Sequence, residues 1–114
     1  MITIYHNPRC SKSRATLKIL EEKGIQPKII EYLKTPPNAA LLGTFLGKLG
    51  MEPRHLMRKG EAPYKELNLA NETQDRATLI DAMVENPILI ERPIVVNGDK
   101  VALGRPPENI LAIL

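Results

Sequence analysis

The first third of the chain carries the pattern that most restricts the fold: a strand, a helix and a second strand with short connections. Residues 1–5 are apolar and β-branched, residues 11–23 show one apolar helical face, and residues 28–32 again resemble a strand. Gly24 follows the helical segment, where a C-cap glycine is typical. Strands joined by one helix in this way are usually parallel, with a right-handed crossover. The pattern predicts an α/β fold that begins with a βαβ unit.

The remainder of the chain reads as a helical block followed by a hairpin. Residues 38–85 are mostly helical, with segments expected at 39–49, 53–59 and 73–85. Asn97-Gly98 separates two apolar runs and is the strongest hairpin signal, because these residues tolerate positive φ. A last helix is expected over 108–113. At 114 residues the chain predicts a single domain, 1–114, of order βαβ, helical insertion (about 38–85), ββα.

Composition excludes several classes of function. Hydrophobic residues at 43% and charged residues at 25% are typical of a soluble globular protein. No apolar run is long enough for a membrane span, and the N-terminus lacks a signal-peptide pattern, so we expect a cytoplasmic protein without a membrane partner. The net charge is only +3, and with one Phe and no Trp nucleic-acid binding is not expected. One cysteine and two histidines exclude an internal disulfide and argue against a metal site.

The single cysteine is the leading candidate for chemistry. Cys10 follows a strand and a turn containing Pro8, and it precedes a helix, whose N-terminus favours a thiolate. Lowering a thiol pKa from about 8.5 to about 6.5 takes roughly 2.7 kcal/mol. A helix end supplies about 0.3–1 kcal/mol, and about 2 at most. At least one basic side chain must therefore stand near the sulfur.

Sequence neighbours offer such basic groups, namely Arg9, Lys12 and Arg14, and His6 lies four residues before the cysteine. The alternative is that Cys10 is a buried small hydrophobic residue, which is common for free cysteines. The polar and basic flanking residues favour the reactive thiol. His6 has two readings as well: it tunes the thiolate, or it is a structural group near a strand end.

Three arginines stand beside helix or strand breakers and are candidates for binding an oxyanion: Arg58, Arg92 and Arg105. The alternative for each is a solvated surface group, and sequence spacing does not show that they converge. Pro93, next to Arg92, either ends a strand or forms a cis peptide bond. Only about 5–6% of such bonds are cis, so the residues alone favour trans.

Four segments, in this order and spacing, closely resemble the glutaredoxin-dependent arsenate reductase family: IYHNPRCSKSR, PYKELNL, NPILIERPIVV and GRPPENIL. The resemblance implies a thioredoxin-like fold with a helical insertion. It also implies reduction of arsenate to arsenite, with glutathione as co-substrate, glutaredoxin as protein partner and no bound cofactor. Ser11-Lys12 departs from the family's well-characterised enzymes, which have Gly-Thr at these two positions.

The resemblance also implies a role for each matching residue. Cys10 corresponds to the catalytic cysteine, and Pro93 to a cis-proline. The other matches are an oxyanion-binding set, Arg58, Arg92 and Arg105, and two supporting residues, His6 and Ser13.

Two alternatives to this function remain. One is an Spx-type regulator, which binds RNA polymerase and usually carries a second cysteine where this chain has Ser13. The other is a glutathione-linked reductase of another substrate. The lone Cys10 and the three arginines favour the arsenate reductase, and we expect it to be a monomer.

Overall fold

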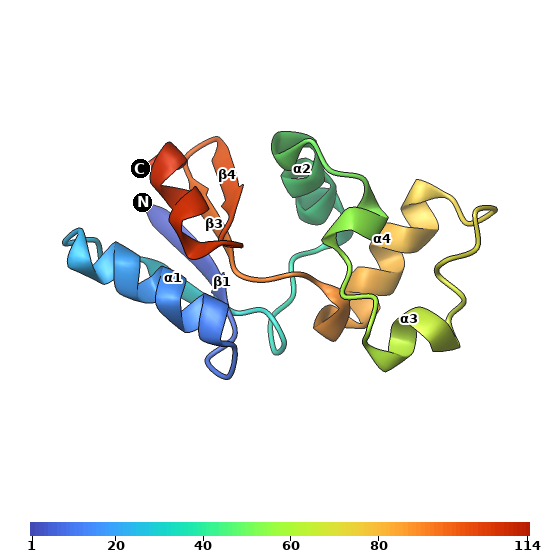
Figure 1. Ribbon diagram of the computed structural model, residues 1–114. Helices are drawn as coiled ribbons and strands as arrows, with labels where there is room; N and C mark the ends of the chain where they lie inside the picture. Colours follow the sequence, from blue (N-terminus) through green and yellow to red (C-terminus); the bar gives the residue numbers. More distant parts are fainter. The chain divides into compact units, whose positions relative to one another are not determined.

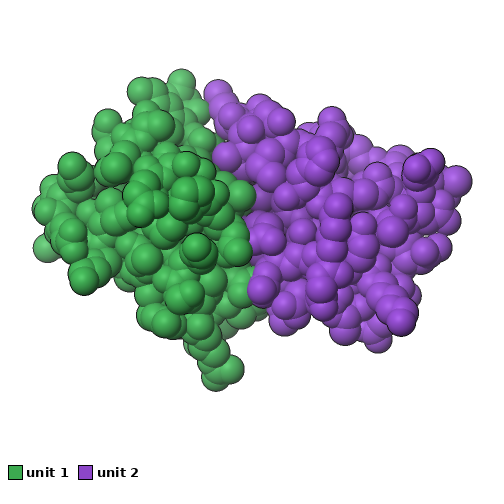
Figure 2. Space-filling model, in the orientation of Figure 1, with its two compact units in different colours: residues 1–35, 92–114 green, residues 36–91 purple.

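The computed structural model describes all 114 residues and divides into two compact units. The first unit combines both ends of the chain, residues 1–35 and 92–114, and the second contains residues 36–91 (Figure 2).

The first unit contains a four-stranded sheet in the order β2-β1-β3-β4, of which Figure 1 labels β1, β3 and β4. The strands are β1 (Ile2–His6), β2 (Lys28–Glu31), β3 (Ile94–Asn97) and β4 (Lys100–Leu103). β1 pairs in parallel with β2 and antiparallel with β3, and β3 and β4 form an antiparallel hairpin. Gly98 has φ +63° in the hairpin turn, a conformation that glycine adopts without strain. The predicted parallel pair and the predicted hairpin are both confirmed.

One face of this sheet is covered by α1 (Ser11–Glu22) and by a 3-10 helix, η3 (Pro107–Ile113). Fully buried apolar residues from the sheet and both helices form the core: Ile4, Leu20, Val95 and Ile110. α1 ends before Gly24, which has φ +76° as the predicted C-cap requires. The C-terminal helix is predicted at the right place, but it is 3-10 rather than α. The βαβ…ββα order is that of a thioredoxin-like fold, as expected.

The second unit is helical. Its elements are α2 (Ala39–Leu49), η1 (Pro53–Leu56), α3 (Ala62–Glu66), α4 (Arg76–Glu85) and η2 (Pro87–Leu89). α4 begins three residues later than predicted, because Asp75 accepts a hydrogen bond from the Thr78 amide and caps the helix there. The segment predicted over 53–59 is only a 3-10 turn, and α3 is an additional short helix. None of the helices could cross a membrane.

Candidate active site

A tight turn connects β1 to α1 and carries the cysteine. The Cys10 amide donates to the Asn7 carbonyl at 3.0 Å, and the Asn7 side-chain oxygen accepts from the Arg9 amide at 3.0 Å. Cys10 is the N-cap residue of α1, with extended backbone angles of φ −93° and ψ 124°. Its side chain is partly exposed. The thiol therefore stands at the N-terminus of a 12-residue helix, where the sequence predicts it.

The surroundings of this thiol favour its ionised form. Burial raises the pKa of Cys10, but the Ser13 amide, the Arg92 guanidinium and the Lys12 amide together outweigh burial and hold the pKa below its ordinary value. Both amides belong to the first turn of α1, whose N–H groups have no partner within the helix. The basic side chain expected near the sulfur is therefore Arg92. Among the sequence neighbours, Arg14 instead donates to the Pro8 carbonyl at 3.0 Å.

Arg92 is a buried arginine with unused hydrogen-bond donors. Its side chain is only 8% exposed, and its Nε and Nη1 atoms have no hydrogen-bond partner in the protein. Buried polar groups are rarely left unpaired, and a charged one is costly unless an anion satisfies it. Arg105 lies beside it and donates from Nη1 to the Arg92 carbonyl at 3.3 Å. A thiolate and a guanidinium with two open donor nitrogens therefore share one site.

Arg58, the third arginine of the expected set, belongs to the second unit. Its Nη1 atom lies 3.0 Å from Glu61 Oε2, and both side chains are about 30% exposed (30% and 28%). Its amide donates to the Leu89 carbonyl at 2.7 Å, which fixes the backbone at this point. The structure thus gives Arg58 a carboxylate partner in its own unit.

Ser13 connects the histidine to the cysteine turn. Its hydroxyl oxygen lies 2.6 Å from His6 Nδ1 and accepts the Asn7 amide at 3.0 Å, and the side chain is completely buried. Burial is the largest effect on His6 and lowers its pKa, so the ring is neutral near pH 7. A neutral ring can accept a hydrogen bond from the Ser13 hydroxyl at Nδ1. His6 therefore touches the turn through Ser13, an arrangement that the sequence did not reveal.

The loop on the other side of the site packs very closely. The Arg92–Pro93 peptide bond is cis, as the resemblance implied, and Arg105–Pro106 is cis as well. Gly104 is buried against Pro93 and α1, and a Cβ atom there would lie 2.5 Å from Thr16 Oγ1 and 2.8 Å from Pro93 Cγ. Only glycine fits between them. Gly104 is a residue that sequence reasoning missed, since nothing local to it indicates which side chains it meets.

The site contains no cluster of three or more His, Cys, Asp or Glu side chains that could hold a metal ion. The chemistry that these residues offer is nucleophilic attack by a thiolate on an anion held by guanidinium groups.

Comparison with known proteins agrees with this arrangement. The model of the ArsC family matches residues 5–113. The chain belongs to the ArsC family. The arsenate reductase of Haemophilus influenzae is 51% identical over 114 residues, covering 99% of this chain and 98% of that protein. The uncharacterized protein YfgD of Escherichia coli K12 is 54% identical over 114 residues, covering 99% of this chain and 96% of that protein.

Among solved structures, the arsenate reductase from Vibrio cholerae superposes with a TM-score of 0.95 at 50% identity, covering 99% of this chain and 97% of that one. ArsC-family relatives therefore match both the sequence and the fold over nearly the whole chain. The expected family and the expected thioredoxin-like fold are confirmed.

Proposed function

We propose that this chain is an arsenate reductase that uses Cys10 as its nucleophile, with glutathione as co-substrate and glutaredoxin as protein partner. The observation that carries the proposal is the pairing of a thiol of lowered pKa with a buried Arg92 whose Nε and Nη1 donors are unpartnered. Relatives about half identical to this chain over nearly its whole length are named arsenate reductases, which supports arsenate as the oxyanion.

In the first step the Cys10 thiolate attacks the arsenic of arsenate. A sulfur–arsenic bond forms, one arsenic–oxygen bond breaks, and the oxygen leaves as water after protonation. Arsenic remains in the +5 state. Arg92 donates hydrogen bonds to the remaining oxygens and offsets their charge, and we assign Arg105, which lies beside it, to the same oxyanion. Arg58 remains the third arginine that the family resemblance implies. A donor of this kind contributes on the order of 10²–10³-fold in rate.

The later steps need thiols from outside the chain, because Cys10 is its only cysteine. Glutathione condenses with the Cys10-bound arsenic and releases a second water. A glutaredoxin thiolate then attacks the glutathione sulfur, and the electron pair of the broken arsenic–sulfur bond stays on arsenic, which becomes arsenic(III). The oxidised product is a glutaredoxin–glutathione mixed disulfide. Water then displaces the Cys10 thiolate and frees arsenite.

Cellular location and assembly belong to the same proposal. Glutathione and reduced glutaredoxin are abundant where thiols are kept reduced, so we place the protein in the cytoplasm. We propose that it acts as a monomer and binds no cofactor, since the proposed steps use only the chain's own thiol and guanidinium groups with thiols from solution. The open donors of Arg92 also favour an enzyme over a regulator that binds a polymerase.

A coupled assay tests the function. Arsenate-dependent NADPH oxidation is measured with glutathione, glutaredoxin and glutathione reductase, for the parent protein and for Cys10→Ser, Arg92→Gln and Arg76→Gln. We expect no turnover with Cys10→Ser and about a 100-fold lower kcat/KM with Arg92→Gln. Arg76 is a half-exposed arginine of the second unit, 3.9 Å from Glu52, so its variant is the charge-matched control.

Two results would contradict the proposal. One is full activity in Cys10→Ser. The other is no arsenate-dependent oxidation by a folded parent protein whose Cys10 is alkylated readily at neutral pH, which would assign the thiol to another substrate.

A further inference from the structure

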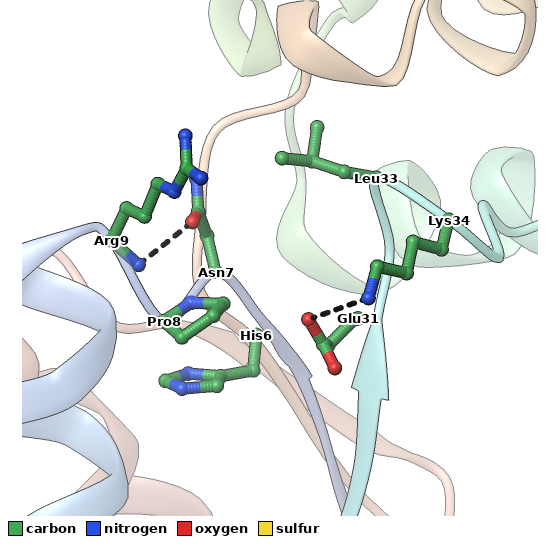
Figure 3. A pocket seen from close by; sticks show the side chains of 7 residues that line it. All are labelled: His6, Asn7, Pro8, Arg9, Glu31, Leu33 and Lys34. Atoms are coloured by element: carbon green, nitrogen blue, oxygen red, sulfur yellow. Dashed lines mark hydrogen bonds and ion pairs between the residues drawn. The ribbon is translucent and has the colours of Figure 1, made fainter.

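A pocket of about 300 Å³ lies at the ends of β1 and β2 in the first unit (Figure 3). Residues 6–9 form one wall, and Glu31, Leu33 and Lys34 form the other. Its volume is at the lower end of the range for small-molecule sites, about 300–1,000 Å³. We refer to it as the β1–β2 pocket.

The sheet topology explains why a pocket forms there. β1 and β2 are parallel, and His6 is paired with Glu31 at their last positions. The backbone turns away from the sheet after each strand. After β1 it forms the Asn7–Cys10 turn, and after β2 it forms a turn in which the Lys34 amide donates to the Glu31 carbonyl at 2.9 Å. Parallel strands commonly bind ligands outside their carboxyl ends.

The pocket adjoins the turn that carries the reactive cysteine. Its first wall is the turn that Cys10 closes by donating to the Asn7 carbonyl at 3.0 Å. Arg9, which lines the pocket, is the residue bonded directly to Cys10. A molecule held in the β1–β2 pocket therefore contacts the turn that carries Cys10, and it leaves Arg92 free because Arg92 does not line the pocket.

The side chains of the pocket suit a ligand that carries both signs of charge. Arg9 and Lys34 bring two positive charges from opposite walls, as Figure 3 shows, and Glu31 brings one negative charge. Glu31 Oε1 and Lys34 Nζ form an exposed ion pair at 3.8 Å, which is longer than a hydrogen bond, so the hydrogen-bonding positions of both groups stay open to a ligand. Leu33 is 43% exposed and adds an apolar surface between them.

We propose that the β1–β2 pocket binds the thiol co-substrate, as a small thiol peptide with two carboxylates and one ammonium group. The carboxylates bind Arg9 and Lys34, the ammonium binds Glu31, and the aliphatic part lies against Leu33. The inference rests on the proposed function, because a chain whose only cysteine is Cys10 must take its second thiol from solution. It adds a binding site separate from the arginines that hold the oxyanion.

The direct test is binding of S-methylglutathione, which has the charges of such a peptide but cannot react with Cys10 or arsenic. In ¹H–¹⁵N NMR titrations of the ¹⁵N-labelled protein without arsenate, we expect shifts concentrated at residues 6–9 and 31–34. Binding should weaken with added salt, since it depends on charge. Shifts confined to other regions, or none at millimolar ligand, would overturn the proposal.

Variants test the charges. Lys34→Gln should weaken S-methylglutathione binding by up to about fivefold, the upper end for an exposed ion pair, and Arg9→Gln by a similar factor. Lys18→Gln is the matched control, because Lys18 is equally exposed (76% against 79%) and also lies near a glutamate, at 4.0 Å from Glu22. Equal affinity of the Lys34→Gln, Arg9→Gln and Lys18→Gln proteins would contradict the proposal.

The same variants in the coupled assay separate this site from the function itself. We expect Lys34→Gln to raise KM for glutathione while KM for arsenate and kcat remain those of the parent. If arsenate is not reduced at all but S-methylglutathione still binds at the β1–β2 pocket, the pocket proposal stands and the arsenate proposal fails. If arsenate is reduced and KM for glutathione is unchanged in Lys34→Gln and Arg9→Gln, the pocket proposal fails alone.

Discussion

Replacing Gly104 with alanine tests how closely the loop after β4 packs against α1. The added Cβ atom would lie 2.5 Å from Thr16 Oγ1, 2.8 Å from Pro93 Cγ and 3.2 Å from Pro93 Cδ. Ordinary contacts between carbon atoms are about 3.5–4.0 Å, so the loop or the helix must move by roughly 1 Å. Neither neighbour yields easily, because the proline ring is rigid and the Thr16 hydroxyl donates to the Lys12 carbonyl at 2.9 Å.

The magnitude follows from two opposing effects. Overpacking of a filled interior costs about 1–3 kcal/mol. Alanine also restricts the conformations of the unfolded chain, which stabilises the folded state by about 0.4–1 kcal/mol. We therefore expect Gly104→Ala to lower the free energy of unfolding by about 1–2 kcal/mol, measured by urea denaturation with far-UV circular dichroism. The corresponding fall in Tm is about 4–8 °C for a chain of this size.

The control is the same chemical change in open space. Gly47 lies inside α2, and nothing lies within 4 Å of a Cβ atom built there. Alanine is favoured over glycine in a helix by about 1 kcal/mol, so Gly47→Ala should stabilise the protein. The alkylation rate of Cys10 gives a second readout. Only Gly104→Ala should change it, because the added methyl group presses on Thr16 of α1, and Cys10 caps that helix. A Gly104→Ala protein as stable as its parent would refute the packing argument.

Three further outcomes are expected. Arg92→Gln should move the pH profile of Cys10 alkylation to higher pH, because the Arg92 guanidinium helps lower the thiol pKa, whereas Arg76→Gln should leave the profile unchanged. Equal profiles for the Arg92→Gln protein and its parent would show that Arg92 does not act on the thiol. Ser13→Ala should cost about 1–3 kcal/mol in urea denaturation, because it leaves buried partners without a hydrogen bond, and parental stability would exclude that role. Burial lowers the pKa of His6 below its ordinary value of 6.5, so the unfolded chain binds more protons than the folded one, and stability should fall as the pH drops below about 6.5. A His6→Gln protein whose stability changes with pH in the same way would assign the pH dependence to other groups.

Local signals in the sequence determined the elements around the site. Pro8 between a short strand and a helix is enough to place Cys10 at a helix N-terminus, because turns and caps depend on neighbouring residues. Asn97-Gly98 identified the hairpin for the same reason. The cis bond before Pro93 was predicted only by the family resemblance, since the residues alone favour trans.

Tertiary structure decided which groups meet. The small effect of a helix end on a thiol pKa showed that a basic side chain must lie near the sulfur. The sequence suggested residues next to Cys10 for this role. Folding instead brings Arg92, which is distant in sequence, to the thiol. The contact between His6 and Ser13, and the packing of Gly104 against Thr16, likewise join segments whose patterns are independent. Local pattern sets the elements because backbone propensities are local. The partners of a buried side chain depend on how sheet and helix pack, which no short stretch of sequence encodes.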